Sequence, residues 1–432
     1  MKSERLKVFI NAFACEPNKG SEGGIGWNVV NKLAAYHDVH VLTRANNREV
    51  IESFYAEKNH KPEHLTFHYY DLPRWAMFWK KKRRGYRLYY YLWLYCSYIA
   101  FRKIVKAGKF DIVHHLTFAQ DAAPNLFVAL NPGKALTVWG PVGRCPAPAA
   151  VKKAMPFKVK LQEALRSGVK IALEHLDIMR IMTEKRTDLL ITYPQDKANV
   201  PFKRKRRGKL IFYPQTGINV ADPEYQLPER VYPERGKRLL ICSEFFHWKG
   251  CTLAAQAFVK LAAKYPDIEL NILGSGPEEK AMRRIFEQGK VGEKVHFHGF
   301  VSKEEMMNIF NTSDLLLYPS YHHGLATVIL QAMWAQLPIV ALKGDFVAHA
   351  VAEGAGLCAD GDTEADIIND IADKAGLILA DANLRQQLGR RGRLLILEKY
   401  SWDVMVEGMS RIYRQLASGA DFEDFQDLTT KN

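Results

Sequence analysis

Residues 319–333, "PSYHHGLATVILQAM", combine residue types that suit anion binding. An apolar run ends in short polar side chains and a glycine, and an apolar helical pattern then begins. The first amides of a helix have no partner within it and carry partial positive charge, so this turn is expected to hold an anion. His323 and Gln331 are eight residues apart, a little over two helical turns, and can therefore face one ligand. The residues whose backbone would meet the anion are Gly324, Leu325, Ala326 and Thr327.

Three more turns follow apolar runs in the same half of the chain. "ICSEFFHWKG" places Lys249 after the first run, where an ammonium can meet a diphosphate as a point charge. "LNILGSGPEEKAM" contains a tight turn at Gly274 that opens another helical pattern. "VHFHGFVSKEEM" presents the backbone groups of Gly299, Phe300 and Val301, which suit the flat edge of a base. Each turn alone is weakly specific, whereas four in succession indicate one shared binding site.

A glycine-rich stretch follows the first apolar run of the chain. In "ACEPNKGSEGGIGWNVV" the glycines precede a helical pattern, and Gly23 and Gly24 would let backbone amides approach a phosphate or sugar closely. The spacing is not G-x-G-x-x-G, and no acid closes the next run, "VHVLTR", so a nicotinamide-dependent dehydrogenase is poorly supported. A flexible turn in a Rossmann-like fold is the alternative interpretation.

Two histidines end the run "FDIVHHLTF". Successive side chains of a strand point to opposite faces, so at most one of His114 and His115 is expected to face a ligand. A histidine in a strand can equally be a core residue with its hydrogen bonds satisfied, and this alternative stays open for both.

A shared site requires a fold that brings the ends of several strands together. Short apolar runs rich in β-branched residues alternate with longer helical patterns, and the rhythm restarts at "KRLLICSEF". Such a pattern predicts parallel sheets covered on both faces, hence two successive Rossmann-like α/β domains whose ligands bind at the strand carboxyl ends. The expected divisions are residues 1–215 completed by a helix at 400–418, a linker at 216–236, a second domain at 237–399 and an acidic tail at 419–432.

Composition limits the class of protein and its partners. The 432 residues carry a formal charge of +14 and a pI near 9.3, which predicts a polyanionic partner: nucleic acid, an anionic membrane surface or a phosphorylated ligand. The six cysteines are scattered without a C-x-x-C pair, and no apolar signal segment follows "MKSERLKVFINAF". These features predict a reduced, cytoplasmic protein.

Residues 74–110 concentrate the positive charge beside aromatic side chains, with eleven Lys and Arg and no acid. The uncharged centre, "LYYYLWLYCSYIAF", is shorter than the ~20 apolar residues of a spanning helix, whereas aromatics beside basic residues suit the inner face of a membrane. Nucleic acid is the alternative partner, but no recognition-module pattern accompanies the segment. We expect "WKKKRRGYR" to be exposed and residues 88–105 to be half-buried. The predicted membrane or acceptor contacts are Trp79, Lys80, Lys81, Lys82, Arg83, Arg84 and Arg144.

The ordered motifs "GSEGGIGW", "DIVHH", "WGPVG", "PQTGI", "WKG", "GSGPEE", "HGFVSKEEM", "DLLLYPS" and "LQAMWAQLPIVA" resemble those of family-four glycosyltransferases. The resemblance covers roughly residues 5–415, and "ACEPNKGSEGGIGWN" is similar to the opening of a bacterial branch that builds surface polysaccharides. It implies the GT-B fold, in which two Rossmann-like domains face each other across a cleft.

The resemblance also implies an activity. A retaining enzyme of the hexosyltransferase type would move a sugar from a nucleotide diphosphosugar to a lipid-linked saccharide or other cell-surface polysaccharide precursor. The donor would bind the second domain and the acceptor the first, without a metal or further cofactor. Lys249 would stabilise the leaving diphosphate, and His114 or His115 would contact the sugar at the reacting carbon. Asp-x-Asp at 360–362 spells a metal-dependent pattern but is expected in a surface loop, so no metal site is predicted.

Three positions depart from the family pattern. His323 and Gln331 stand where the family usually has Glu-x7-Glu, and the residues near Ser243 and Glu244 replace an arginine that usually precedes the lysine. By family role, position 323 addresses donor sugar hydroxyls and position 331 the nucleotide ribose. Both substitutes can hydrogen-bond a hydroxyl, though more weakly than a carboxylate. Altered donor recognition is one interpretation. The alternative is a catalytically degenerate GT-B protein that binds a saccharide or a partner.

Overall fold

The structure is a computed structural model of the chain. It describes residues 5–80, 85–143, 147–155, 157–193, 207–321, 325–344, 346–420 and 422. Seven of the residues predicted to bind a ligand or a membrane lie outside these ranges: Lys81, Lys82, Arg83, Arg84, Arg144, His323 and Gly324.

The first domain is built on a parallel sheet of seven strands in the order β3-β2-β1-β4-β5-β6-β7. Side chains alternate between its faces: in β1, Val8 and Ile10 pack into one core cluster and Phe9 into another. Because both faces are covered by helices, the central strands β1 and β4 are almost entirely buried, as expected. The strands are β1 (Lys7–Ala12), β2 (Asp38–Arg44), β3 (Leu65–Tyr70), β4 (Ile112–Thr117), β5 (Leu136–Trp139), β6 (Leu189–Thr192) and β7 (Lys209–Phe212).

The second domain is built on a parallel sheet of six strands in the order β10-β9-β8-β11-β12-β13. In its central strand, Leu239 and Ile241 belong to one core cluster and Leu240 to the other, so this sheet is also buried on both faces. The strands are β8 (Arg238–Cys242), β9 (Glu269–Leu273), β10 (Val295–Gly299), β11 (Leu315–Tyr318), β12 (Ile339–Leu342) and β13 (Gly356–Ala359).

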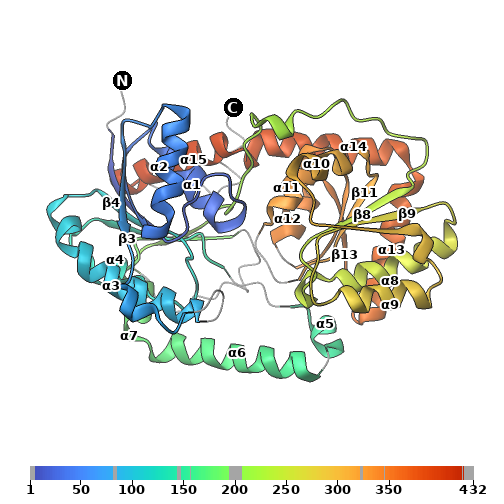
Figure 1. The fold of residues 1–432 in the computed structure, drawn as a ribbon, viewed down its shortest axis with the longest axis horizontal. Helices are drawn as coiled ribbons and strands as arrows, with labels where there is room; N and C mark the ends of the chain where they lie inside the picture. Colours follow the sequence, from blue (N-terminus) through green and yellow to red (C-terminus); the bar gives the residue numbers. More distant parts are fainter. Residues whose placement is uncertain are drawn as a thin grey trace.

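Helices cover the faces of each sheet (Figure 1). Apolar residues of α3 and α4 pack in one cluster of the first domain, whereas those of α1, α2 and α15 pack on the opposite face. In the second domain α8, α9 and α13 cover one face and α10, α11 and α12 the other. The helices are α1 (Ser21–Leu33), α2 (Arg48–Lys58), α3 (Tyr86–Ala107), α4 (Leu126–Leu130), α5 (Ala149–Ala154), α6 (Phe157–Leu176), α7 (Ile178–Arg186), α8 (Cys251–Lys264), α9 (Glu279–Gln288), α10 (Lys303–Thr312), α11 (Thr327–Trp334), α12 (Phe346–Ala352), α13 (Glu364–Ala380), α14 (Ala382–Leu395) and α15 (Trp402–Ser418).

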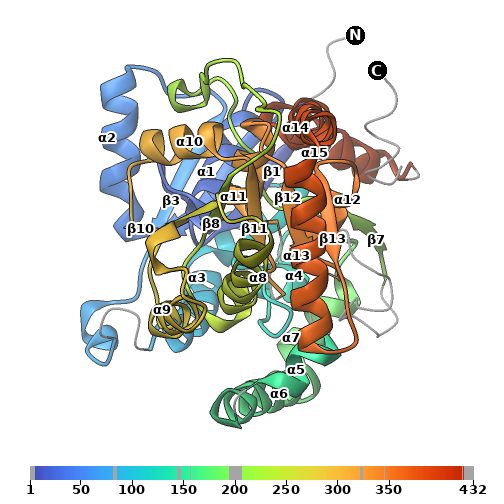
Figure 2. The ribbon, with the colours of Figure 1, turned by 90° about the vertical axis from the view of Figure 1, so that its right-hand side faces the viewer.

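The chain crosses between the domains several times. The expected linker lies between β7 and β8, and α15 returns to pack on α1, where Lys32 and Asp403 form a 2.6 Å ion pair. One crossing was not expected from the sequence. Ala150 and Val151 of α5 lie in the core of the second domain, and α6 then runs back to α7, which packs on α4 of the first domain (Figures 1 and 2). Residues 147–155 therefore pack with the second domain, although the sequence division assigned them to the first.

Local expectations needed other corrections. Gly23 and Gly24 lie inside the first turn of α1, not ahead of it, and only Gly20 precedes the helix. The Asp-x-Asp residues 360–362 lie in an exposed loop after the edge strand β13, as expected. No helix within the described ranges is long and apolar enough to cross a membrane.

Candidate functional site

The carboxyl ends of the two sheets face each other. Tyr193 directly follows β6 of the first domain, and Phe346 begins α12 after β12 of the second; their rings are nearly parallel, with centroids 6.5 Å apart. Within the first domain, Glu22 of α1 accepts a hydrogen bond of 3.0 Å from the side-chain amide of Gln215, just before the linker. The predicted turns of both domains are therefore directed toward one region between the domains.

Lys249 lies at the exit of two strands. It ends the short 3-10 helix η5 (His247–Lys249) after β8, and its Nζ lies 2.9 Å from the hydroxyl oxygen of Tyr318, the last residue of β11. The backbone N–H of Tyr321 donates to the carbonyl of Trp248 at 3.0 Å, which ties the two loops together. Gly250 has φ 65°, and a Cβ there would lie 2.2 Å from the carbonyl oxygen of Pro319. The loop can approach β11 this closely only with glycine at this position.

The start of α11 has the features of an anion site. Thr327 is the first helical residue, and Ala326 at the N-cap has no side chain that could satisfy the first amides. Leu325 is buried and holds the turn against the core. The predicted contacts Leu325, Ala326 and Thr327 therefore lie at a helix start after β11, the strand whose last residue contacts Lys249.

Gln331 is buried, with 6% of its surface exposed. Its Nε2 donates to the hydroxyl of Tyr225 at 3.2 Å, and Tyr225 belongs to the linker helix η4 (Pro223–Tyr225). The carbonyl of Tyr225 accepts a 2.7 Å bond from Trp334, and Lys303 lies over its ring at 4.7 Å. The predicted ribose contact thus forms a joint between α11 and the linker, and Tyr225 is a site residue that the sequence did not reveal.

The two remaining turns of the second domain differ in packing. Gly274 has φ 113°, and a Cβ there would lie 2.0 Å from the carbonyl oxygen of Ser243, so the turn after β9 packs against the loop after β8. Gly299 ends β10 with φ 69° and has open space around it. Phe300 is 75% exposed and Val301 is half-buried, so the turn after β10 offers both backbone groups and an exposed ring.

In the first domain, glycines and an acid shape the start of α1. A Cβ on Gly24 would lie 2.1 Å from the carbonyl oxygen of Lys19, whereas Gly23 has its nearest neighbour at 3.4 Å. The carboxylate of Glu22 accepts a hydrogen bond of 3.1 Å from the backbone N–H of Phe118. Burial raises the pKa of this carboxyl group. Glu22 lies within the glycine-rich motif of the sequence, and an acid among glycines is the signal that could have identified it as a candidate site residue.

His114 is fully buried between β4 and α15. Its Nε2 donates to the carbonyl of Gly140 at 2.7 Å, so Nδ1 must accept, and the hydroxyl of Tyr413 donates to it at 2.5 Å. Burial lowers the pKa of His114 to about 4. Both ring nitrogens are engaged inside the protein, and contact with a sugar would require one of these bonds to break.

His115 points to the other face, as strand alternation requires, and is also buried. The hydroxyl of Tyr90 donates to the carbonyl of Phe118 at 2.6 Å, so it accepts from Nε2 of His115 at 3.1 Å. Burial, and next the neighbouring His114, lowers the pKa of His115 to about 3. The ring is therefore neutral near pH 7, and its catalytic role stays a prediction.

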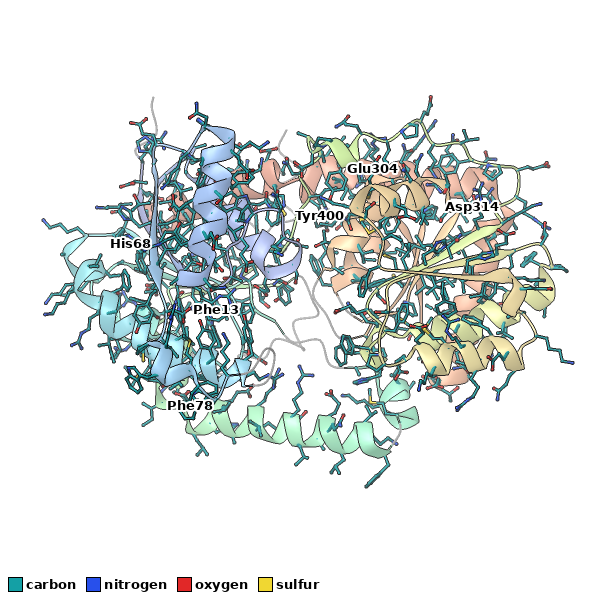
Figure 3. All side chains as sticks on the ribbon, in the orientation of Figure 1. Phe13, His68, Phe78, Glu304, Asp314 and Tyr400 are labelled. Atoms are coloured by element: carbon teal, nitrogen blue, oxygen red, sulfur yellow. The ribbon has the colours of Figure 1, made fainter. Side chains whose placement is uncertain are left out.

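The basic segment is less exposed than its composition indicates. Trp79 and Lys80 are both half-buried. The Trp79 ring packs closely against Gly85, where an added Cβ would lie only 2.8 Å from the ring, and the Nζ of Lys80 lies 3.8 Å from the ring centre of Tyr89. The strongly exposed aromatic residues here are Trp75 and Phe78, and Figure 3 shows Phe78 near the lower edge of the molecule. The prediction that Trp79 and Lys80 are exposed is wrong, because the ring of Trp79 and the side chain of Lys80 pack against the start of α3.

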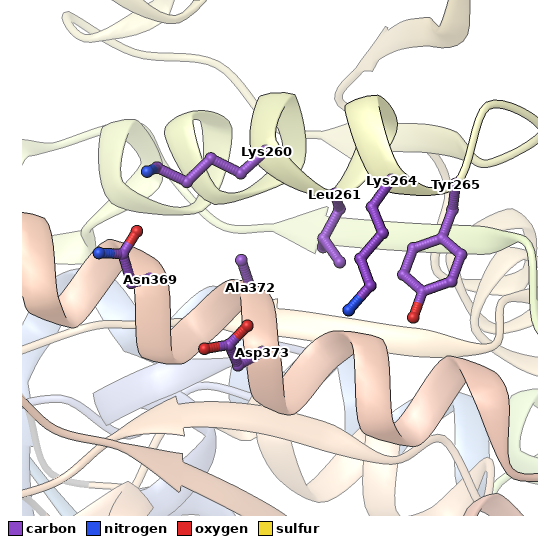
Figure 4. A pocket seen from close by; sticks show the side chains of 7 residues that line it. All are labelled: Lys260, Leu261, Lys264, Tyr265, Asn369, Ala372 and Asp373. Atoms are coloured by element: carbon purple, nitrogen blue, oxygen red, sulfur yellow. The ribbon is translucent and has the colours of Figure 1, made fainter.

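Two other features of the second domain are a pocket and the Asp-x-Asp pattern. A pocket of about 140 Å³ lies between α8 and α13, with Lys264 and Tyr265 in its wall (Figure 4). These residues directly precede β9, so the pocket lies at the opposite edge of the sheet from the turns. Asp360 of the Asp-x-Asp pattern forms a 2.7 Å ion pair with Lys343, and the described residues contain no group of three His, Cys, Asp or Glu placed to hold a metal.

Two curated proteins illustrate the sequence relatives of the chain. An uncharacterized glycosyltransferase of Haemophilus influenzae is 27% identical over 196 residues, which are 44% of this chain and 53% of that protein. A GDP-mannose-dependent monoacylated alpha-(1-6)-phosphatidylinositol monomannoside mannosyltransferase of Corynebacterium glutamicum is 26% identical over 203 residues, 45% of this chain and 48% of that protein. The chain thus spans about half the length of the curated relatives that it matches.

Solved structures and a family description agree on the architecture. Sucrose-phosphate synthase from Thermosynechococcus elongatus superposes with a TM-score of 0.65 at 19% identity, over 96% of this chain and 100% of that one. WaaG, a glycosyltransferase involved in lipopolysaccharide biosynthesis, superposes with a TM-score of 0.56 at 18% identity, over 94% of this chain and 99% of that one. Residues 226–395 match the family described as "Glycosyl transferases group 1". The expected GT-B fold is confirmed, and most of its second domain matches the model of the group 1 glycosyltransferases.

Proposed function

We propose that the chain is a retaining, metal-independent glycosyltransferase that moves a sugar from a nucleotide diphosphosugar to a lipid-linked saccharide or other cell-surface polysaccharide precursor. It would work in the cytoplasm, at the inner face of an anionic membrane. The observation that carries the proposal is that Lys249 contacts the last residue of β11 and that the uncapped helix α11 follows this strand, in the domain that matches the group 1 family.

The proposed reaction uses these groups on the leaving diphosphate. The bond between the sugar carbon and the diphosphate oxygen breaks, and the charge that develops there is stabilised by the Lys249 ammonium and the amides of α11. In a retaining reaction of this type the acceptor hydroxyl attacks from the leaving-group side, and its proton passes to the departing phosphate oxygen. No protein nucleophile is required. Closure of the domains would exclude water that could otherwise hydrolyse the donor.

The proposed class of acceptor is supported by the charge of this chain and by the substrate in the name of one relative. The formal charge of +14 favours an acceptor or surface that carries phosphate, and the Corynebacterium glutamicum relative is named for a phosphatidylinositol mannoside substrate. The test is mass spectrometry of lipid extracts incubated with the protein and a panel of nucleotide sugars. A mass increase of one sugar residue on a lipid-linked species supports the proposal, and the absence of any such product contradicts it.

A second candidate function is a degenerate GT-B module that binds a saccharide or a partner without transfer. The observation that favours it is Gln331, which is buried and bonded to Tyr225 where the family resemblance places a ribose-binding acid. Melting temperatures with added nucleoside diphosphates separate the two, because a ligand that binds only the folded state raises the melting temperature. Stabilisation favours the transferase, and its absence favours the module.

A further inference from the structure

α6 presents its apolar side to solvent. Helical residues four apart lie on one face, and this helix repeats exposed apolar residues at that spacing. The exposed fractions are 78% for Phe157, 50% for Leu161, 63% for Leu165, 62% for Val169 and 78% for Leu176. We call these five side chains the outer face of α6. Contiguous exposed apolar surface of this kind marks an interaction site.

The opposite side of α6 is charged and contacts the rest of the protein. Glu163 lies 3.5 Å from Arg166 of the same helix and 4.0 Å from the ring nitrogen of His247, and Lys170 forms a 3.3 Å ion pair with Asp121. A surface helix of a globular protein normally has the reverse arrangement, with its apolar stripe toward the core. Packing among the residues that the structure describes therefore does not explain the outer face.

The charges around the outer face have one sign. Of the described side chains in α5 and α6, the exposed lysines are Lys152, Lys153 and Lys160, whereas both acids, Glu163 and Glu174, are half-buried. An apolar face flanked by exposed lysines complements an anionic lipid surface. A second copy of a chain with a formal charge of +14 would instead be repelled, so charge disfavours self-association.

The apolar surface continues onto the first domain. α3 exposes a second stripe at helical spacing, formed by Leu88, Leu92, Tyr95 and Ile99. The hydroxyl of Tyr91 in α3 donates to the carbonyl of Ala122 at 2.9 Å, and the neighbouring Asp121 forms the ion pair with Lys170 of α6, which places α3 near α6. Figure 1 shows α6 along the lower edge of the molecule, and Figure 3 shows Phe78, 81% exposed, near the same edge.

We propose that the outer face of α6, continued by the α3 stripe, docks on the surface of an anionic lipid bilayer. The helix would lie in the plane of the interface with its apolar side chains among the acyl chains and its lysines at the headgroups. Because α5 packs with the second domain and α7 with the first, this docking orients both domains on the surface. The inference deepens the proposed function by assigning the face that would reach a lipid-linked acceptor.

The test measures partition of the purified full chain onto phosphatidylcholine vesicles with and without phosphatidylglycerol. Leu161→Glu combined with Leu165→Glu should lower partition onto anionic vesicles at least tenfold. The matched control is Leu377→Glu with Leu394→Glu, because these leucines are 60% and 49% exposed on α13 and α14 of the second domain. The control should bind within twofold of the parent, and unchanged melting temperatures would exclude misfolding.

Three outcomes would overturn the inference. The first is failure of the parent to bind anionic vesicles, and the second is equal binding by the α6 variant and the parent. The third is sedimentation that shows a dimer for the parent and a monomer for the α6 variant, which would assign the face to a second copy. Titration of the same samples with a nucleoside diphosphate tests the donor site separately. Nucleotide binding without vesicle binding contradicts only the docking face, whereas vesicle binding without nucleotide binding contradicts only the donor site.

Discussion

The Nζ atom of Lys249 lies 2.9 Å from the hydroxyl oxygen of Tyr318 and 5.4 Å from the centre of its ring. This contact joins the loop after β8 to the end of β11, and the start of α11 follows a few residues later. The hydroxyl fixes the position of the ammonium at the exit of β11 before a ligand binds.

Replacement of this lysine tests its role. Lys249→Ala should weaken binding of a nucleoside diphosphate at least tenfold, about 1.4 kcal/mol or more, because a charge-assisted hydrogen bond to phosphate is lost. Tyr318→Phe should cause a smaller loss, since the lysine remains but is less well oriented. The measurement is calorimetric titration, with the exposed Lys260→Ala as control. Unchanged affinity in Lys249→Ala would remove this residue from the site.

The joint between Gln331 and Tyr225 gives a second prediction. If Gln331 serves donor recognition, Gln331→Ala should weaken nucleotide-sugar binding more than Tyr225→Phe, because only the first removes the amide. Both variants lose one hydrogen bond of the joint and should destabilise the fold by about 1 kcal/mol. Titration and denaturant unfolding of both variants separate the effects. Equal nucleotide-sugar binding by parent and Gln331→Ala would remove Gln331 from donor recognition, whereas no binding by either would favour the degenerate module.

Adjacent glycines in α1 offer a matched pair. Gly24→Ala should lower the free energy of unfolding by about 1–3 kcal/mol, because the new Cβ would lie 2.1 Å from the backbone oxygen of Lys19 and the loop must shift. Gly23→Ala should be neutral or slightly stabilising, since its nearest neighbour is 3.4 Å away and alanine favours a helix. Thermal unfolding of the two variants checks this order, and equal stability would show that the close approach is not maintained.

The buried histidines predict a loss of stability in mild acid. The pKa of His114 falls from 6.5 to about 4 and that of His115 to about 3 on folding, because burial disfavours the charged ring. The unfolded chain therefore binds more protons below pH 6.5, and stability is retained above that pH and lost as the pH falls toward 4. Each histidine should contribute up to about 2 kcal/mol of this loss between pH 6.5 and 5.

Denaturant unfolding at pH 7 and pH 5 measures this effect. His114→Gln should reduce the difference between the two pH values, because the titrating group is gone, whereas the exposed His60→Gln should leave it as in the parent. A parent whose stability does not change over this range would show that the rings are not held neutral.

The sequence predicted much of the fold because strand periodicity is local. It missed β7 and β13, each four residues long, since "KLIF" follows a run of basic residues and "GLCA" is short and rich in small residues. It also missed the α5 crossing, because an apolar pattern does not indicate which domain a helix packs against. The exposed face of α6 has the period of a core-facing helix, so only the structure reveals that it points outward.

At the candidate site, the turns were predictable and their partners were not. Lys249 and the start of α11 follow from what comes after each strand. Tyr318 and Tyr225 contact residues 69 and 106 positions away, and such pairings depend on how the sheets and the linker pack. The same holds for His114, whose partner Tyr413 belongs to the last helix.

Calorimetric titration of the parent and Lys249→Ala against uridine, guanosine and deoxythymidine diphosphate sugars tests the central claim, a nucleotide-sugar site at the β11 exit. The account predicts that the parent binds at least one of these donors and that Lys249→Ala binds the same donor at least tenfold more weakly. Absence of binding by the parent across the complete panel would contradict the donor site and the transferase function, and would leave only the fold.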